Sequence, residues 1–599
     1  MTQAPPIIRA LMCVLALAVT WIWVAAPATG QTAPEGNAHP AAQALSAMGR
    51  SLPNPFGEAA RTLRGVKTGD EKLAFANALD LEPLRDLAVS HNGRVKILDT
   101  LARETVRRLC GRAVYREDEL DPADHSGKRI TTRKFDPLFT LLDVTIDPAY
   151  YIEKPLIGVE YLPLRRALVE AAMPDDEARA NRYLRLGRVS PRMISDHANA
   201  LAATHMRDDA FQRGLSTLDQ AIGLFLESHA NFVMVAPERA DLPWAHLSSL
   251  PAEHPARAAA AALGAAWRAA DPAAANAAIR DLARELPAIN APVYPTSKRT
   301  LELTYNRANA FEWGFWAYGI ALLTLLLAFA TGRGWVANLG VGLLLVGIVL
   351  HAFGFVTRCI IAERFAIQNQ FESMTGLSLF GVMASGVIML ARRQFLFGAA
   401  GAAVGFLVLI VATQTAIPGQ FIAREAAILN TSVLLKYHVT TVLYSYAFIA
   451  LGFVLSLFYL GHYYAGVFKG SPASVPAPAG VAVALGDERG VIGTRDRLLA
   501  DLDTAQMVVL QLAFWTLGVG ILLGAWWADH SWGRWWAFDP KETWALITWI
   551  VYLIVIHVRV ASPARKGLTT AWLSVVGFIV MLWTYFGVNL LLPGLHAYA

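Results

Sequence analysis

The residues best suited to chemistry in this chain are seven tryptophans gathered near its C-terminus, between Trp526 and Trp549. The segment reads WWADHSWGRWWAFDPKETWALITW. Tryptophan favours membrane interfaces, which would account for a few rings at the ends of spanning helices. That explanation does not readily cover five indoles within eleven residues, followed by an Asp-Pro-Lys-Glu turn. Such a platform suits a large, flat, apolar ligand with a charged edge.

Haem has this form, and its iron commonly takes neutral imidazole as an axial ligand. Arg534 or Lys541 could pair with the haem propionates. Histidine is costly inside an apolar span, so each histidine there calls for a functional hypothesis. The candidates in the apolar part of the chain are His351, His438, His462, His557 and His596.

The composition predicts the elements that position these residues. Of 599 residues, 55% are hydrophobic and only 17% are charged, whereas water-soluble proteins carry about 25% charged residues. Residues 31–305 are rich in Arg, Asp and Glu, and the rest of the chain is mostly apolar. We therefore expect an all-α polytopic membrane protein with a mostly helical N-terminal domain. Eight apolar runs are long enough to span a bilayer, and they cover residues 313–330, 335–356, 374–391, 395–413, 438–460, 507–527, 544–560 and 570–592.

The first 30 residues predict export of the N-terminal domain. Arg9 precedes an apolar stretch from Ala10 to Ala26, and Pro27 ends it among small residues. This pattern is typical of a secretory signal peptide. An uncleaved anchor helix is the alternative, because a run of this length could nearly span a bilayer. Both interpretations export a soluble domain at residues 31–305 and leave residues 306–599 as the membrane domain.

Within the soluble domain, the spacing of Ala, Leu and Arg predicts helices at residues 97–110 and 258–286. Residues 141–146 have a β-like pattern. We find no phosphate loop, metal-ligand spacing or catalytic triad in this part of the sequence, which favours a helical docking module.

Charge and cysteine content exclude several functions. The net charge of +5 is small, and basic residues appear in the short loops between apolar runs, which indicates membrane topology rather than nucleic-acid binding. The cysteines Cys13, Cys110 and Cys359 form no CxxC pair, which argues against a thioredoxin-like site and a thiolate metal site. The sequence also has no CxxCH, so the protein is not itself a c-type cytochrome.

Orientation follows from the exported domain, because the first span must then run inward. This places the loops at Arg333, Arg392 and Arg559 inside, as basic residues prefer. The tryptophan loop and the C-terminus fall outside. His438 begins the fifth span at that interface and His596 follows the eighth, so two imidazoles could hold a haem iron beside the tryptophans. A histidine at a span end can also be merely interfacial.

The segment WGRWWAFDPKETWALITWIVYLIVIH closely resembles the "WWD" signature of the CcsA/ResC-type cytochrome c synthases. The resemblance covers roughly residues 310–599 in the same order. Phe538 departs from it, because the family commonly has tryptophan there, and His530 stands at an otherwise variable place. Three further segments carry the resemblance: NQFESM (Asn369 to Met374), KYHVTTVLYSYAFIALG (Lys436 to Gly452) and YFGVNLLLPGLHAY (Tyr585 to Tyr598).

The resemblance implies a role in system II cytochrome c biogenesis. Such a protein binds haem b, moves it to the outer face and presents it for covalent attachment to the CxxCH segment of apocytochrome c. It would act as a component of a holocytochrome c synthase, supplying positioning and exclusion of water more than acid–base catalysis. The implied location is the bacterial inner (cytoplasmic) membrane, with the N-terminal domain and the WWD loop (residues 526–543) on the periplasmic side.

The resemblance also assigns residue roles. His438 and His596 match the outer pair of iron ligands. His557 matches one ligand of an inner haem site, whose opposing ligand often comes from a CcsB/ResB-like partner subunit. The residues expected to contact haem within the WWD loop are Trp532, Trp535, Trp536 and Asp539.

Other interpretations stay open at this point. Asp539 and Glu542 could orient the loop, and Arg364 could meet a propionate or have a structural role. His351 and His462 are weaker candidates for the inner site. His351 lies toward the outer half of its span, and His462 lies at the inner end of the fifth span, where a histidine can be merely interfacial. A haem exporter or chaperone without synthase activity would carry a similar loop. An ion-coupled transporter would leave that loop unexplained.

Overall fold

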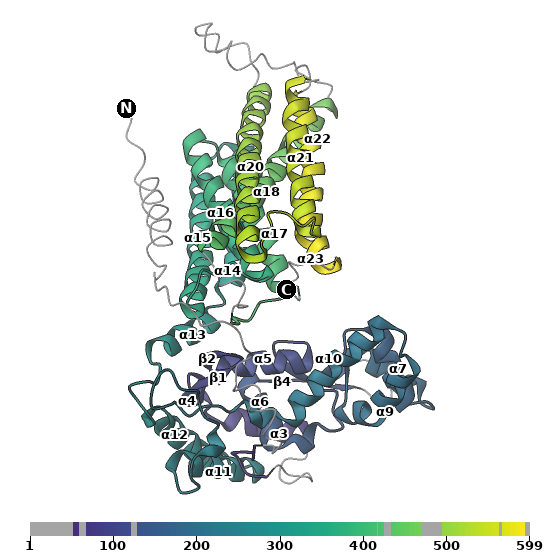
Figure 1. The fold of residues 1–599 in the computed structure, drawn as a ribbon, viewed down its shortest axis with the longest axis vertical. Coiled ribbons are helices and arrows are strands. Elements are labelled where there is room, and N and C mark those ends of the chain that lie inside the picture. Colours follow the sequence, from purple (N-terminus) through teal and green to yellow (C-terminus); the bar gives the residue numbers. More distant parts are fainter. Residues whose placement is uncertain are drawn as a thin grey trace. The chain divides into compact units, whose positions relative to one another are not determined.

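The chain forms two compact units, Gln31–Arg307 and Ala308–Ala599, in a computed structural model (Figure 1). The structure describes residues 52–58, 68–120, 129–415, 417–424, 433–468, 494–561 and 566–592. The expected signal peptide or anchor at residues 1–30 and His596 lie outside the described residues. Each unit is described by itself below.

The described part of the N-terminal unit is mainly helical. Its helices are α3 (Gly69–Ala78), α4 (Glu82–Arg85), α5 (Leu98–Cys110), α6 (Pro137–Ile146), α7 (Leu162–Ala172), α8 (Glu177–Leu186), α9 (Pro191–Thr204), α10 (Asp209–Leu226), α11 (Pro255–Arg268), α12 (Pro272–Ala288) and α13 (Ser297–Ala308), with short 3-10 turns at Pro148–Tyr151, Ser228–Asn231 and Leu247–Ser249. Small antiparallel pairs join β1 (Ala88–His91) to β2 (Arg94–Ile97), β3 (Tyr115–Leu120) to β4 (Arg129–Phe135), and β5 (Ile157–Gly158) to β6 (Arg188–Val189).

Two local expectations for this unit need correction. Residues 141–146 belong to helix α6, not to a strand. Asp136 caps that helix, Pro137 starts it, and it is buried all round, so its apolar run lacks a helical period. The expected helix at 258–286 is two helices, because Ala270 adopts a positive φ and Asp271 caps α12 through its side chain. The helix expected at 97–110 is confirmed as α5.

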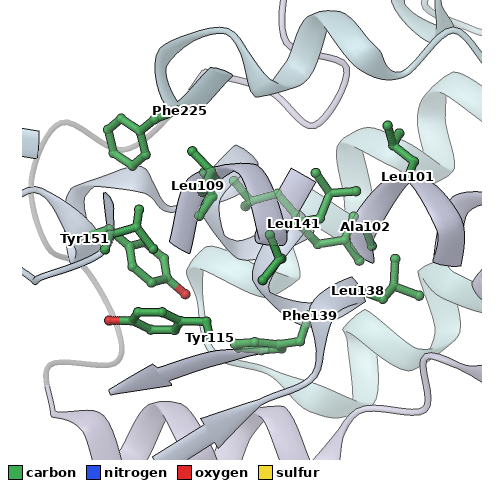
Figure 2. Close-up of a cluster of buried hydrophobic side chains, with 14 of the residues drawn as sticks. Leu101, Ala102, Leu109, Tyr115, Leu138, Phe139, Leu141, Tyr151 and Phe225 are labelled. Carbon is green, nitrogen blue, oxygen red and sulfur yellow. The ribbon is translucent and has the colours of Figure 1, made fainter. Parts of the chain in front are cut away.

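The core of this unit is a large cluster of buried side chains that includes residues of α5, α6 and β3, such as Leu101, Phe139 and Tyr115 (Figure 2). Tyr115 stacks on Phe135, Phe135 on Phe139, and Phe139 on Trp267, with ring centroids 5.2–5.9 Å apart. Beside this stack, the buried Lys72 Nζ lies 2.9 Å from Asp143 and 3.0 Å from a second aspartate. The apolar core therefore contains a buried lysine, Lys72, whose charge is paired with two carboxylates. A charge in low-dielectric surroundings requires such pairing.

The membrane unit has eight described helices that are long and apolar enough to cross a bilayer, which confirms the expected all-α polytopic fold. The helices are α14 (Ala310–Thr331), α15 (Gly334–Ala362), α16 (Gln370–Arg392), α17 (Phe395–Gln414), α18 (Val433–Phe468), α20 (Thr494–Trp532), α21 (Pro540–Ala561) and α22 (Lys566–Leu582), and a π-helical turn at Trp583–Gly587 leads into α23 (Val588–Leu591). Helix α18 packs along α20, and α14 packs against α15 and α17.

Large apolar side chains on the outside of this bundle are exposed, such as Trp316 and Leu323 on α14 and Val349 on α15. In water such a surface would be unfavourable, whereas lipid chains cover it without cost. The protein is therefore a multi-pass membrane protein, whose polar groups must find partners inside the bundle.

Candidate functional site

One end of the membrane bundle contains a cavity built from four separate stretches of the chain. Its lining comes from the connection into α16 (residues 365–373), the start of α18 (435–446), the end of α20 through the start of α21 (521–545), and the π-helical turn (584–585). The cavity brings together His438, Trp527, Trp535, Trp536 and Lys541. The tryptophan loop and the first histidine of α18, which are far apart in sequence, therefore share one site.

His438 is held in a defined orientation by helix α20. Its Nδ1 lies 2.7 Å from the backbone oxygen of Gly520. A carbonyl can only accept, so Nδ1 carries the proton and Nε2 carries the lone pair that could bind a metal. A Cβ at Gly524 would lie 2.5 Å from Cε1 and 2.7 Å from Nδ1 of this imidazole. Glycine at position 524 is thus what allows the ring to lie against the helix.

The tryptophan-rich segment is more helical than expected. Helix α20 continues through Trp532, because neither glycine nor proline stands between Trp526 and Trp532, and it ends at Gly533, whose φ is +69°. The irregular part of the expected loop at 526–543 is therefore only residues 533–539. Trp527 is 2% exposed and makes an edge contact with Trp532, with 4.9 Å between ring centroids. Trp532 supports a cavity residue without being part of the cavity lining.

Asp539 and Glu542 fix the start of α21. Glu542 accepts hydrogen bonds from the backbone N–H groups of Ala537 (2.9 Å) and Asp539 (3.3 Å). Asp539 in turn accepts from the backbone N–H of Lys541 at 3.3 Å. With Pro540 at the first helical position, this is a helix-capping arrangement. Asp539 is buried and does not line the cavity, so its contacts in the structure orient the turn.

The lining residues before and at the start of α16 depend on a buried ion-pair network that the sequence interpretation missed. Glu372 pairs with Arg358 at 3.0 Å and with Arg364 at 2.6 Å. The side chains of Arg358 and Glu372 are both 0% exposed. Arg358 also donates to the backbone oxygens of Gln420 (2.7 Å) and Gly419 (2.6 Å). Of the two roles considered for Arg364, the structure therefore supports the structural one.

This network sets the position of residues 368–373, of which Gln368, Asn369, Gln370 and Ser373 line the cavity. Asn369 caps α16 by accepting from the backbone N–H of Glu372 at 2.9 Å. The hydroxyl of Ser373 hydrogen-bonds the hydroxyl of Tyr585, which ties α16 to the π-helical turn. Arg358 was the feature of the sequence from which this network could have been predicted. Its charge stands just beyond an apolar run, and such a charge needs a partner inside the protein.

Among the described residues, His351 and His557 do not line this cavity. His351 is fully buried, with Nε2 2.9 Å from the backbone oxygen of Thr375 and Nδ1 3.3 Å from the hydroxyl of Tyr318. It is a hydrogen-bonded core residue. His557 is exposed on α21, with Nδ1 2.8 Å from the backbone oxygen of Leu553. It lies about 25 Å along the helix from Pro540, at 1.5 Å per residue.

The lining fits an amphiphilic aromatic ligand. Indole rings offer flat apolar faces, His438 offers a ring nitrogen with a lone pair, and Lys436 and Lys541 supply positive charge. Arg534, the other cation considered from the sequence, is exposed and does not line the cavity. Haem matches this set, because it combines a flat macrocycle, a metal that accepts imidazole and two carboxylates.

Comparison with known proteins points the same way. Residues 308–596 match the model of the family described as "Cytochrome C assembly protein". The "Cytochrome c biogenesis protein CcsA" of Guillardia theta is 31% identical over 245 residues, which cover 40% of this chain and 79% of that protein. CcsA of Chlamydomonas reinhardtii is 36% identical over 164 residues, or 27% of this chain and 40% of that protein.

A third relative is the "Protein NrfI" of Wolinella succinogenes. It is 30% identical over 312 residues, which cover 51% of this chain and 32% of that protein. The matched part of this chain thus spans less than half the length of the Chlamydomonas and Wolinella relatives.

Proposed function

This chain belongs to the CcsA family of cytochrome c biogenesis proteins, and on that premise we propose that its cavity binds haem b for covalent attachment to apocytochrome c. The observation that carries the proposal is the convergence on one cavity of His438 from α18, Trp535 and Trp536 from the segment after α20, and Lys541 from α21. In this proposal the protein is the component of a holocytochrome c synthase that presents haem.

Each part of the cavity has a distinct task in the proposal. His438 supplies one axial ligand through Nε2, oriented by its hydrogen bond to Gly520. His596, which lies outside the described residues, supplies the opposite ligand. Trp535 and Trp536 stack on the macrocycle, and Lys541 pairs with a propionate. Trp532 and Asp539 act on haem indirectly, by holding Trp527 and the start of α21 in place.

The attachment chemistry needs no leaving group. Haem provides two vinyl groups, and the CxxCH segment of the apocytochrome provides two thiols. Each thiol adds across one vinyl group, so an S–C bond forms, the vinyl π bond breaks and the thiol hydrogen goes to the neighbouring vinyl carbon. The chain's own residues hold the reactants in position and limit the access of water, which is how an oriented site lowers such a barrier.

His557 is proposed as a ligand of a second, inner haem site from which haem moves to the cavity. Its imidazole is exposed on the side of α21, at a depth where exposure means contact with lipid or with another protein. A CcsB/ResB-like membrane subunit would supply the opposing ligand. His557→Ala is then expected to lower the haem content of the cavity.

We also propose the bacterial inner membrane as the location, with the cavity on the periplasmic side. The basic residues Arg333, Arg392 and Arg393 support this orientation, because they lie at the helix ends opposite those that border the cavity. Basic residues favour the cytoplasmic side of a membrane.

The proposal is tested by coexpressing the full chain with a CcsB/ResB-like partner and a CxxCH reporter, then staining for covalently attached haem. We expect haem-stained reporter that depends on this chain. Bound haem without covalent product would contradict the synthase proposal and favour a haem exporter or chaperone.

A further inference from the structure

The lining of the cavity contains buried polar atoms without hydrogen-bond partners among the described residues. Gln370, the first residue of α16, is 6% exposed, and neither its Nε2 nor its Oε1 has a partner. Oε1 of Gln368 and Nε1 of Trp527 are also buried and also have no hydrogen-bond partner among the described residues. All three residues line the cavity. Buried polar groups are nearly always hydrogen-bonded in folded proteins, so this concentration points to a ligand.

The backbone that carries these amides is fixed. The backbone oxygen of Gln370 accepts from the hydroxyl of Ser373 at 3.0 Å, and the hydroxyl oxygen of Tyr585 lies 3.4 Å from the same backbone oxygen. Glu372, one half-turn further on, is held by two arginines, and its carboxylate also accepts from the backbone N–H of Gln368 at 3.1 Å. The backbone that carries these two lining residues is therefore held in place by its own contacts.

The kinds of unpaired atom identify the ligand chemistry. Among the described residues, the unpaired buried atoms of these lining residues are two acceptors, Oε1 of Gln368 and of Gln370, and two donors, Nε2 of Gln370 and Nε1 of Trp527. A haem propionate only accepts hydrogen bonds, so it would leave both oxygens unpaired and facing an anion. A polypeptide backbone offers N–H donors and C=O acceptors in alternation along an extended strand, and so matches both kinds of atom.

We propose that Gln370 hydrogen-bonds the backbone of an extended polypeptide segment that enters the cavity. Resting on the proposed function, that segment is the part of apocytochrome c around the reacting cysteines. Nε2 of Gln370 donates to a backbone oxygen of the segment, Oε1 accepts from a backbone N–H, and Gln368 supplies a further acceptor. Gln370 is in this role a positioning residue for the peptide, independent of side-chain identity.

The test measures peptide binding to the purified, haem-containing full chain. The probe is a fluorescently labelled peptide with a Ser-Xaa-Xaa-Ser-His segment, in which serine replaces cysteine so that binding occurs without reaction. Gln370→Leu is expected to raise the Kd about 5- to 20-fold, the loss of roughly two hydrogen bonds. Haem content per protein should stay unchanged. Gln414→Leu, an exposed glutamine at the end of α17, is the matched control and should bind like the wild type.

A second probe tests the proposal on the wild-type protein alone. Methylating the backbone nitrogens of the peptide removes the donors, so wild-type affinity should fall and the difference between wild type and Gln370→Leu should shrink. Equal affinity of both proteins for the unmethylated peptide would overturn the proposal. So would a loss of haem in Gln370→Leu that disappears with haem dimethyl ester, because Gln370 would then hold a propionate.

Failure of the proposed function has a separate signature. If the wild-type chain yields no haem-stained reporter, the synthase proposal fails, whereas the peptide affinities of wild type and Gln370→Leu are measured without any reaction.

Discussion

Gly524→Ala should displace the imidazole of His438 and weaken haem binding. A methyl group at position 524 would lie 2.5 Å from Cε1, 2.7 Å from Nδ1 and 3.1 Å from Nε2 of that ring. Contacts this short do not persist, so the ring must turn away from α20 and lose its hydrogen bond to Gly520. Helix α20 itself should tolerate the change, since alanine is a better helix former than glycine.

The size of the effect follows from two contributions. Forcing the ring back to its ligand position against the methyl group costs about 1–3 kcal/mol, as in an overpacked core. Losing the hydrogen bond to Gly520 adds about 0.5–1.5 kcal/mol. At about 1.4 kcal/mol per factor of ten, haem binding should weaken by roughly 10- to 1,000-fold.

The assay is a haem titration of the purified full-length variant, followed by visible absorption. Gly461→Ala is the matched control, because Gly461 lies in α18 and a Cβ there would meet no atom within 4 Å. The control should bind haem like the wild type. Equal haem affinity in Gly524→Ala and in wild type would refute the assigned role of His438.

Three further predictions follow from the described contacts. His438→Ala and His596→Ala should each abolish haem-stained reporter in the coexpression assay; full activity in both would reject the outer ligand pair. Glu372→Gln should lower the free energy of unfolding by about 3–5 kcal/mol, because two buried arginines lose their carboxylate; an unchanged Tm in detergent would contradict this. Burial and neighbouring basic charges lower the pKa of His91 to about 4 from 6.5. Its contribution to stability is therefore complete above pH 6.5 and is lost as the pH falls towards 4. Relative to His91→Gln, the wild type should lose about 2 kcal/mol between pH 7 and pH 5; parallel pH profiles would contradict the shift.

The membrane fold could be predicted from the sequence because each span is defined by its own side chains. A run of apolar residues is recognisable whatever it packs against. The convergence of the tryptophan segment with His438 was also predictable, since alternating spans bring every second connection to the same side. The local predictions were wrong in two kinds of place. In α6, burial on all sides removes the helical period from the sequence. In α20, the helix continues beyond the apolar run as far as Gly533.

The polar wall of the cavity could not be predicted in the same way. Arg358 meets Glu372 after 14 residues and the backbone oxygens of Gly419 and Gln420 after 61 and 62 residues. Such partners depend on how three helices and a connecting loop pack, and not on a local pattern. Gln370 was equally hidden, because only the three-dimensional surroundings show that this cavity-lining residue is buried and that its amide has no hydrogen-bond partner among the described residues.

The most direct test of the central claim is the visible absorption spectrum of the purified full-length protein, compared with that of His438→Ala. We predict that the wild type carries haem with the low-spin spectrum of two imidazole ligands, and that His438→Ala loses that spectrum. A wild-type protein without haem absorption, or a variant with an unchanged spectrum, would contradict the account.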